Sequence, residues 1–124
     1  MKYVIKGWGY EKWIVNKKEY CGKLLFFKAG KRCSYHYHKI KDETFYLQKG
    51  RMIIRYATEG VYKKRGEKQE NWSNVCNTII LEAGQKFYVP VGMHHQMEAI
   101  TDCELFEFST EHFEEDSYRI TKGD

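Results

Sequence analysis

Two histidines and one glutamate stand at a spacing that suits a metal site. His36 and His38 are two residues apart, so on a β-strand their side chains leave the same face. Glu43 follows after four intervening residues, and Gly30 and Gly50 bracket the group in the pattern G-x5-H-x-H-x4-E-x6-G. Imidazole and carboxylate groups are ligands of first-row divalent metals. This stretch therefore predicts three ligands of one metal ion.

A fourth ligand comes later in the chain. The pattern G-x5-P-x-G-x2-H ends at His95, where Pro90 and Gly92 form a tight corner before a strand begins. A turn over 39–42 would return the chain on a partner strand, so that Glu43 lies beside the histidine pair. The predicted metal ligands are His36, His38, Glu43 and His95. Manganese, iron, nickel, cobalt and zinc all suit this donor set, so the sequence does not choose the metal.

Other interpretations of the histidines stay open. The four residues could form a hydrogen-bonded polar cluster without a metal. His94 points to the opposite face of a strand from His95, but it would exchange roles with His95 if the corner were irregular. His112 lies in an acidic segment and is expected at the surface. A metal is favoured because a carboxylate buried among imidazoles would otherwise need protonation or costly desolvation.

Short segments rich in strand-forming residues must position these ligands. Aromatic residues make up 16% of the chain, and most turns carry Gly, Asn or Asp because there is one proline. Strands are predicted over 12–15, 20–28, 32–38, 44–47, 51–56, 78–81, 85–89, 93–99 and 103–109. Only 111–118 looks helical, and the long polar segment 58–77 is expected to form an excursion with a small hairpin around Gly66. The pattern predicts an all-β sandwich or barrel.

Length and composition exclude several classes of protein. The 124 residues fit a single domain over 1–124 that buries a core without covalent staples. No apolar run is long enough to span a membrane and no signal peptide is visible, so a cytoplasmic location is expected. Four scattered cysteines lack C-x-x-C spacing and are expected to be free thiols. The net charge of +4 is mild, and the basic run 63–68 is interpreted as a solvated loop, not a nucleic-acid site.

The two patterns, in this order, resemble those of the cupin superfamily. The resemblance implies a double-stranded β-helix, or jelly-roll barrel, with a metal inside one end. It places the ligands at His36, His38, Glu43 and His95. The family's second pattern often continues to an Asn where this chain has Ala99, but that Asn is not a ligand, so the metal prediction is unaffected.

The whole chain is also similar to the cupin domain of type II phosphomannose isomerases. Residues 8–11, Trp-Gly-Tyr-Glu, look like that family's P-W-G-x-Y-E opening, and 20–30 match its Y-K-V-K-R-L-T-V-K-P-G strand in length. This alignment places Lys23 on a family lysine and Glu107 on a glutamate of the last strand. The tail over 114–119 resembles the family's E-D-D-I-V-R ending.

The resemblance implies a metal-dependent enzyme that acts on a sugar or sugar phosphate in the manner of an isomerase. Lys23 and Glu107 are then the candidate acid–base residues. The family usually carries Gln at the position of His36, and its cupin domain is often fused to a nucleotidyltransferase, so the substrate is open. A metal-dependent oxygenase or lyase, and a non-catalytic carbohydrate-binding protein, are the alternatives. A homodimer is expected, because the apolar strand around 13–15 could extend a neighbour's sheet.

Overall fold

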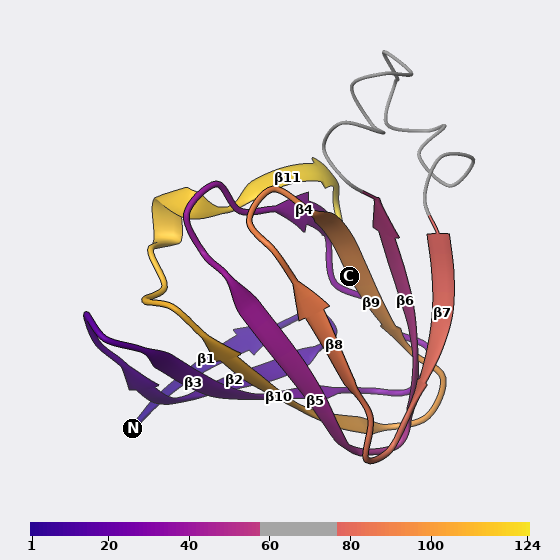
Figure 1. The fold of residues 1–124 in the computed structure, drawn as a ribbon. Helices are drawn as coiled ribbons and strands as arrows, with labels where there is room; N and C mark the ends of the chain where they lie inside the picture. Colours follow the sequence, from indigo (N-terminus) through magenta and orange to yellow (C-terminus); the bar gives the residue numbers. More distant parts are fainter. Residues whose placement is uncertain (58–76) are drawn as a thin grey trace.

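The computed structural model describes residues 1–57 and 77–124, and these form two antiparallel sheets that face each other (Figure 1). The six-stranded sheet contains, in spatial order, β1 (Lys2–Lys6), β2 (Gly9–Asn16), β3 (Cys21–Phe27), β10 (Cys103–Ser109), β5 (Glu43–Lys49) and β8 (Lys86–Val89). The five-stranded sheet contains β11 (Tyr118–Thr121), β4 (Tyr35–Tyr37), β9 (His94–Ala99), β6 (Arg51–Ala57) and β7 (Asn77–Glu82). The predicted all-β barrel is confirmed.

The hydrophobic core lies between the two sheets and follows the two-residue period of the strands. In β3, β5 and β10 every second residue is buried, because alternate side chains point to the inner face. The buried residues from the two sheets include Leu25, Phe27, Phe45, Leu47, Leu105, Met52, Ile54 and Met97. This core holds the strands that carry the candidate ligands in fixed positions.

The connection after β4 differs from the sequence-based expectation. Glu43 was expected on a strand that pairs directly with the histidine strand, but β4 pairs with β9 and β11 while β5 pairs with β10 and β8. Both edges of the short β4 are therefore taken by other strands. The turn over 39–42 carries the chain from one sheet to the other, so Glu43 approaches the histidines from the opposite sheet (Figure 1).

The two ends of the chain also differ from the prediction. The first strand begins at Lys2 and forms a hairpin with β2, in which Trp13 pairs with both β1 and β3. Beyond Trp13, β2 pairs with β3 alone, so the rest of the segment 13–15 lies at the edge of the sheet. Near the other end, only Glu114–Asp116 forms a 3-10 turn, and β11 follows at once; the predicted helical segment over 111–118 is wrong in its extent.

The hairpin expected around Gly66 and the basic run 63–68 lie outside the described residues. In the ranges 1–57 and 77–124, no helix has the length and apolar character needed to cross a membrane.

Candidate metal centre

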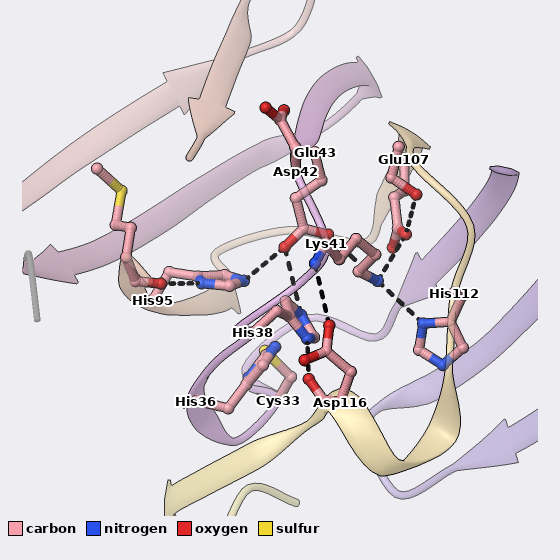
Figure 2. A network of polar contacts seen from close by, with 12 residues as sticks. Cys33, His36, His38, Lys41, Asp42, Glu43, His95, Glu107, His112 and Asp116 are labelled. Carbon is pink, nitrogen blue, oxygen red and sulfur yellow. Dashed lines mark hydrogen bonds and ion pairs between the residues drawn. The ribbon is translucent and has the colours of Figure 1, made fainter. Parts of the chain in front are cut away.

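The four predicted ligands meet inside one end of the barrel (Figure 2). His36 on β4 lies opposite His95 on β9, with ring centres 4.4 Å apart, and the ring of His38 lies 5.0 Å from that of His36. One nitrogen from each of the three rings lies within 4.8 Å of the others. From the opposite sheet, Glu43 places its Oε2 atom 3.2 Å from Nε2 of His95 and 3.4 Å from Nε2 of His38.

The three imidazoles share one hydrogen-bonding arrangement, in which each ring places Nδ1 against a backbone carbonyl. The acceptors are the carbonyl of Ser34 for His36 at 2.8 Å, that of Asp116 for His38 at 2.7 Å, and that of Met93 for His95 at 3.0 Å. A carbonyl only accepts, so Nδ1 carries the ring proton in each case. Nε2 is then left as the lone-pair nitrogen of each ring, as a metal-binding histidine requires.

This orientation leaves two buried acceptors facing each other. Oε2 of Glu43 and Nε2 of His95 lie 3.2 Å apart, and among the described residues neither has a hydrogen-bond partner. No proton lies between them, since the His95 proton is on Nδ1. Buried acceptors without a donor are costly, and a cation between them would remove that cost. The residues therefore fit a divalent metal ion.

The protonation states also suit a metal. Burial opposes the ionisation of Glu43, but the Lys41 ammonium, 3.5 Å from Oε1, prevails and holds the pKa of that carboxyl well below its ordinary value. Burial, together with the neighbouring His95 and His38, lowers the pKa of His36 well below 6.5. The centre thus offers a carboxylate and neutral imidazole, which are the forms that bind metals.

His94 does not share this centre. Its ring stacks on Tyr35 at 6.0 Å and packs edge-on against Tyr37 at 4.5 Å, and none of these three residues lines the cavity beside the metal centre. The strand alternation of β9 therefore holds through the Pro90–Gly92 corner. His95 alone of the histidine pair faces the other candidate ligands.

The candidate acid–base residues line that cavity, which has a volume of about 480 Å³. Lys23 on β3 and Glu107 on β10 are register partners, and both are buried. Oε2 of Glu107 accepts hydrogen bonds from Lys41 at 2.9 Å and from the Ser109 hydroxyl at 3.0 Å, while the Lys23 ammonium lies 3.6 Å from Oε1 of Glu11. These two residues are thus buried in ion pairs beside the metal centre and do not lie on the surface.

Lys41 connects the candidate metal ligand Glu43 to Glu107. The position of Lys41 in the sequence did not predict this contact. Its ammonium is buried and contacts three acceptors: Oε2 of Glu107 at 2.9 Å, Nδ1 of His112 at 3.1 Å and Oε1 of Glu43 at 3.5 Å (Figure 2). Burial disfavours its charge, but Glu107 and Glu43 raise its pKa above the ordinary lysine value. A lysine in a polar turn is normally exposed, so only the fold reveals this contact.

The expectation that His112 is a surface residue is wrong. Only 11% of its side chain is exposed, it lines the cavity, and its ring packs edge-on against Trp13 at 5.1 Å. Burial and then the Lys41 ammonium lower the pKa of His112 to about 3. It is therefore neutral at neutral pH and accepts the Lys41 hydrogen bond.

The remaining walls of the cavity are part apolar and part charged, and the charged side chains include Lys6, Arg119 and Lys122. Phe45 and Met97 line the cavity, and Trp8 stacks on Phe27 at a ring-centre distance of 4.1 Å. Where apolar side chains adjoin buried charged groups, they lower the local dielectric constant, which strengthens the interactions of those charges. The cavity thus brings candidate metal ligands together with the buried candidate acid–base residues Lys23 and Glu107, between partly apolar walls.

No protein-family model matches this sequence, and no curated protein matches it. Solved structures, in contrast, match this chain in fold. CapF in complex with the inhibitor 3-isopropenyl-tropolone matches with a TM-score of 0.76 at 17% identity, over 97% of this chain and 34% of that one. Oxalate decarboxylase from Bacillus subtilis, in a structure at pH 4.6, matches with a TM-score of 0.76 at 16% identity, over 96% of this chain and 30% of that one.

KdgF from Halomonas sp. is similar along its length. It matches with a TM-score of 0.70 at 14% identity, over 93% of this chain and 90% of that one. This chain therefore spans about a third of the length of CapF and of oxalate decarboxylase, and most of KdgF. At these identities the likeness shows the fold alone.

Proposed function

This chain has the cupin fold, and from that premise we propose that it is a metal-dependent enzyme that isomerises a sugar or sugar phosphate. One observation carries the proposal: candidate metal ligands on both sheets line the same cavity as Lys23 and Glu107. A divalent metal held by His36, His38, Glu43 and His95 would polarise a carbonyl or hydroxyl oxygen of the sugar. Aldose–ketose interconversion also needs a base that moves a proton between adjacent carbons.

Glu107 is the residue best placed to hold that proton. Its Oε2 atom is occupied by Lys41 and Ser109, whereas Oε1 makes no hydrogen bond to any residue that the structure describes. Lys41 therefore fixes the direction of the carboxylate and leaves Oε1 to exchange a proton with the substrate. Lys23, whose ammonium is buried on the neighbouring strand, would stabilise negative charge on a substrate oxygen.

The apolar part of the cavity wall supports the same proposal. Trp8, Phe27 and Phe45 are buried and present apolar surface to the cavity that the acid–base groups line, which would limit the water beside them. Exclusion of water protects a reactive intermediate from side reactions. The cavity volume of about 480 Å³ lies in the range that holds small molecules. We further infer a cytoplasmic location, which the free, buried thiols of Cys21, Cys33 and Cys103 support.

The test is an assay of metal-loaded protein against a panel of aldoses, ketoses and their phosphates in deuterated water. Proton NMR would follow both the interconversion and the exchange of the C2 proton. We expect the Glu107→Gln protein to retain its metal and lose turnover by about 100-fold or more. The matched control is Glu104→Gln, on the same strand but on its outer face, which should leave turnover unchanged. Absence of exchange with every sugar and every metal would contradict the proposal.

A second candidate is a metal-dependent lyase or oxygenase. A structural neighbour named as a decarboxylase has the same fold, and three histidines with one glutamate also suit iron or manganese. Oxygen consumption with iron(II) that is absent with zinc would favour an oxygenase, and release of carbon dioxide from a carboxylic acid would favour a lyase. Tight sugar binding without any turnover would instead identify a carbohydrate-binding protein.

A further inference from the structure

One buried residue contacts both segments that carry ligands, although it is no ligand itself. Asp116 is 2% exposed and lies at the end of the 3-10 turn Glu114–Asp116. Its side chain binds the turn over 39–41, and its backbone carbonyl binds His38. We propose that Asp116 is a positioning residue that fixes His38 and Glu43 relative to each other and thereby sets the affinity for the metal. The inference rests on the proposed metal centre and not on the isomerase activity.

The Asp116 carboxylate accepts backbone N–H groups from three successive residues. Oδ1 accepts from Lys39 at 2.9 Å and from Ile40 at 3.1 Å, and Oδ2 accepts from Lys41 at 3.0 Å. Successive N–H groups that converge in this way form a concave anion-binding site in the backbone. Hydrogen bonds to an ionised acceptor are about twice as strong as neutral ones. The carboxylate therefore holds the turn in one conformation.

The same residue fixes the orientation of His38. Its carbonyl accepts the Nδ1 proton of His38 at 2.7 Å, the shortest of the three carbonyl contacts to the candidate ligands. That bond sets both the tautomer and the direction of Nε2. A shift of the carbonyl would move the lone pair of His38 away from Oε2 of Glu43, which is now 3.4 Å away.

The turn that Asp116 holds is the link between His38 and Glu43. Because β4 and β5 belong to different sheets, no strand pairing fixes the separation of these two ligands. The conformation of 39–42 fixes it instead. The turn also carries Lys41, whose ammonium lies 3.5 Å from Oε1 of Glu43 and so helps to direct Oε2 towards the histidines. Asp116 thus acts on both ligands through contacts on the chain between them.

The experiment measures cobalt(II) affinity for the wild type and for Asp116→Ala, by competition with a chelator, together with the visible d–d spectrum of the bound ion. The substitution removes the carboxylate and keeps the backbone carbonyl. We expect about 10-fold to 100-fold weaker binding and an altered spectrum, as for other residues that support metal ligands. Circular dichroism would verify that the variant is folded. These readouts do not depend on turnover.

The matched control is Asp102→Ala. Asp102 also accepts a backbone N–H, that of Ala29 at 2.8 Å, but it does not line the cavity. The Asp102→Ala protein should bind cobalt(II) with the same affinity as the wild type. If Asp116→Ala does not fold, Asp116→Asn, which keeps the volume and one acceptor oxygen, should bind the ion several-fold more weakly than the wild type.

The outcomes separate the two proposals. A folded Asp116→Ala or Asp116→Asn protein with the affinity and spectrum of the wild type would overturn the positioning role while leaving the metal centre intact. Equal weakening in Asp102→Ala would also overturn it, because the effect would then be a general loss of stability. A wild type that binds no cobalt(II) would overturn the metal centre and this inference with it. Loss of isomerase activity alone would leave the inference standing.

Discussion

At the scale of single residues, the two oxygens of Glu43 have different surroundings. Oε2 faces lone pairs on two imidazoles, whereas Oε1 faces the Lys41 ammonium. The lysine therefore keeps the carboxyl ionised and leaves one oxygen for a cation. This division of contacts also connects the candidate ligand to Glu107, because the same ammonium lies against both carboxylates.

His112 should make the stability of the metal-free protein depend on pH. The folded protein lowers the pKa of His112 from 6.5 to about 3, through burial and the nearby Lys41 and Lys23 ammoniums. Between these values the unfolded chain binds a proton that the folded chain does not. Stability contributed by the neutral ring is therefore present above the unfolded pKa of 6.5 and is lost as the pH falls towards 3.

The measurement is urea unfolding of wild type and His112→Gln with chelator present, at about pH 7 and about pH 5. Between pH 6.5 and about pH 5, each pH unit lowers the free energy of unfolding of the wild type by about 1.4 kcal/mol. From about pH 7 to about pH 5 the wild type should therefore lose about 2 kcal/mol more of that free energy than the variant does. Identical losses in the two proteins would show that His112 titrates normally.

Sequence spacing was sufficient to predict the candidate ligands but not the residues that support them. His36 and His38 belong to a local pattern, and local patterns can be interpreted from strand geometry. The contact between His38 and the Asp116 carbonyl joins residues 78 positions apart, and that between Lys41 and Glu107 joins residues 66 apart. No periodicity carries such information, since it arises only when the two sheets close on each other.

At the scale of elements, most strands matched their predicted segments, but the one predicted pairing, between the strand of His36 and the strand of Glu43, was wrong. The segment over 103–109 is strand β10 with the predicted limits. The partner of β4 was predicted incorrectly, because adjacency in sequence favours a hairpin, whereas in this barrel the chain crosses between sheets after β4. Register and sheet assignment depend on closure of the whole barrel, which a segment's own residues do not specify.

The glycine of the turn between β5 and β6 gives an element-scale prediction. Gly50 and Gly84 both have positive φ, at 99° and 90°. A Cβ at Gly50 would clash with the Asp102 carbonyl oxygen, whereas a Cβ at Gly84 has nothing within 4 Å. Gly84→Ala should therefore cost about 1 kcal/mol of backbone strain, and Gly50→Ala about 3 kcal/mol or more because a backbone clash is added.

Urea unfolding of the two alanine variants beside the wild type would check this difference. The Gly84→Ala protein is the matched control, since it shares the backbone conformation without the crowding. Equal losses of unfolding free energy in the two variants would mean that the turn at Gly50 relaxes without cost, contrary to the prediction.

At the scale of the whole molecule, a bound metal would join the two sheets. Three candidate ligands come from the five-stranded sheet and its margin, and Glu43 comes from the six-stranded sheet. Metal at about 100 times its dissociation constant should stabilise the folded chain by about 2.7 kcal/mol. For a chain of this length that corresponds to a rise in Tm of about 10 °C.

Differential scanning calorimetry with and without added zinc or manganese would measure the shift. The His38→Ala protein should show little or none of it, because it lacks one candidate ligand. An equal shift in His38→Ala would place the metal elsewhere on the protein.

The predicted homodimer also belongs to this scale. The strand expected to extend a neighbour's sheet lies between β1 and β3 as far as Trp13, and its residues beyond Trp13 pair with β3 alone; the outermost strands of the six-stranded sheet are β1 and β8. Light scattering at micromolar concentration should nevertheless give twice the chain mass of 14.9 kDa. A particle of 14.9 kDa would remove the prediction.

The pairing of early strands with late ones also has a consequence for biosynthesis. A ribosome completes β3 and β4 long before it completes their partners β10, β9 and β11. The nascent chain would present His36, His38 and Glu43 well before His95 and Asp116 leave the exit tunnel. A barrel built from such distant pairings folds late and slowly. The candidate metal centre is therefore complete only after β9 and Asp116 have been translated, so an ion would be acquired by the closed barrel and not by the nascent segment that carries β4 and β5.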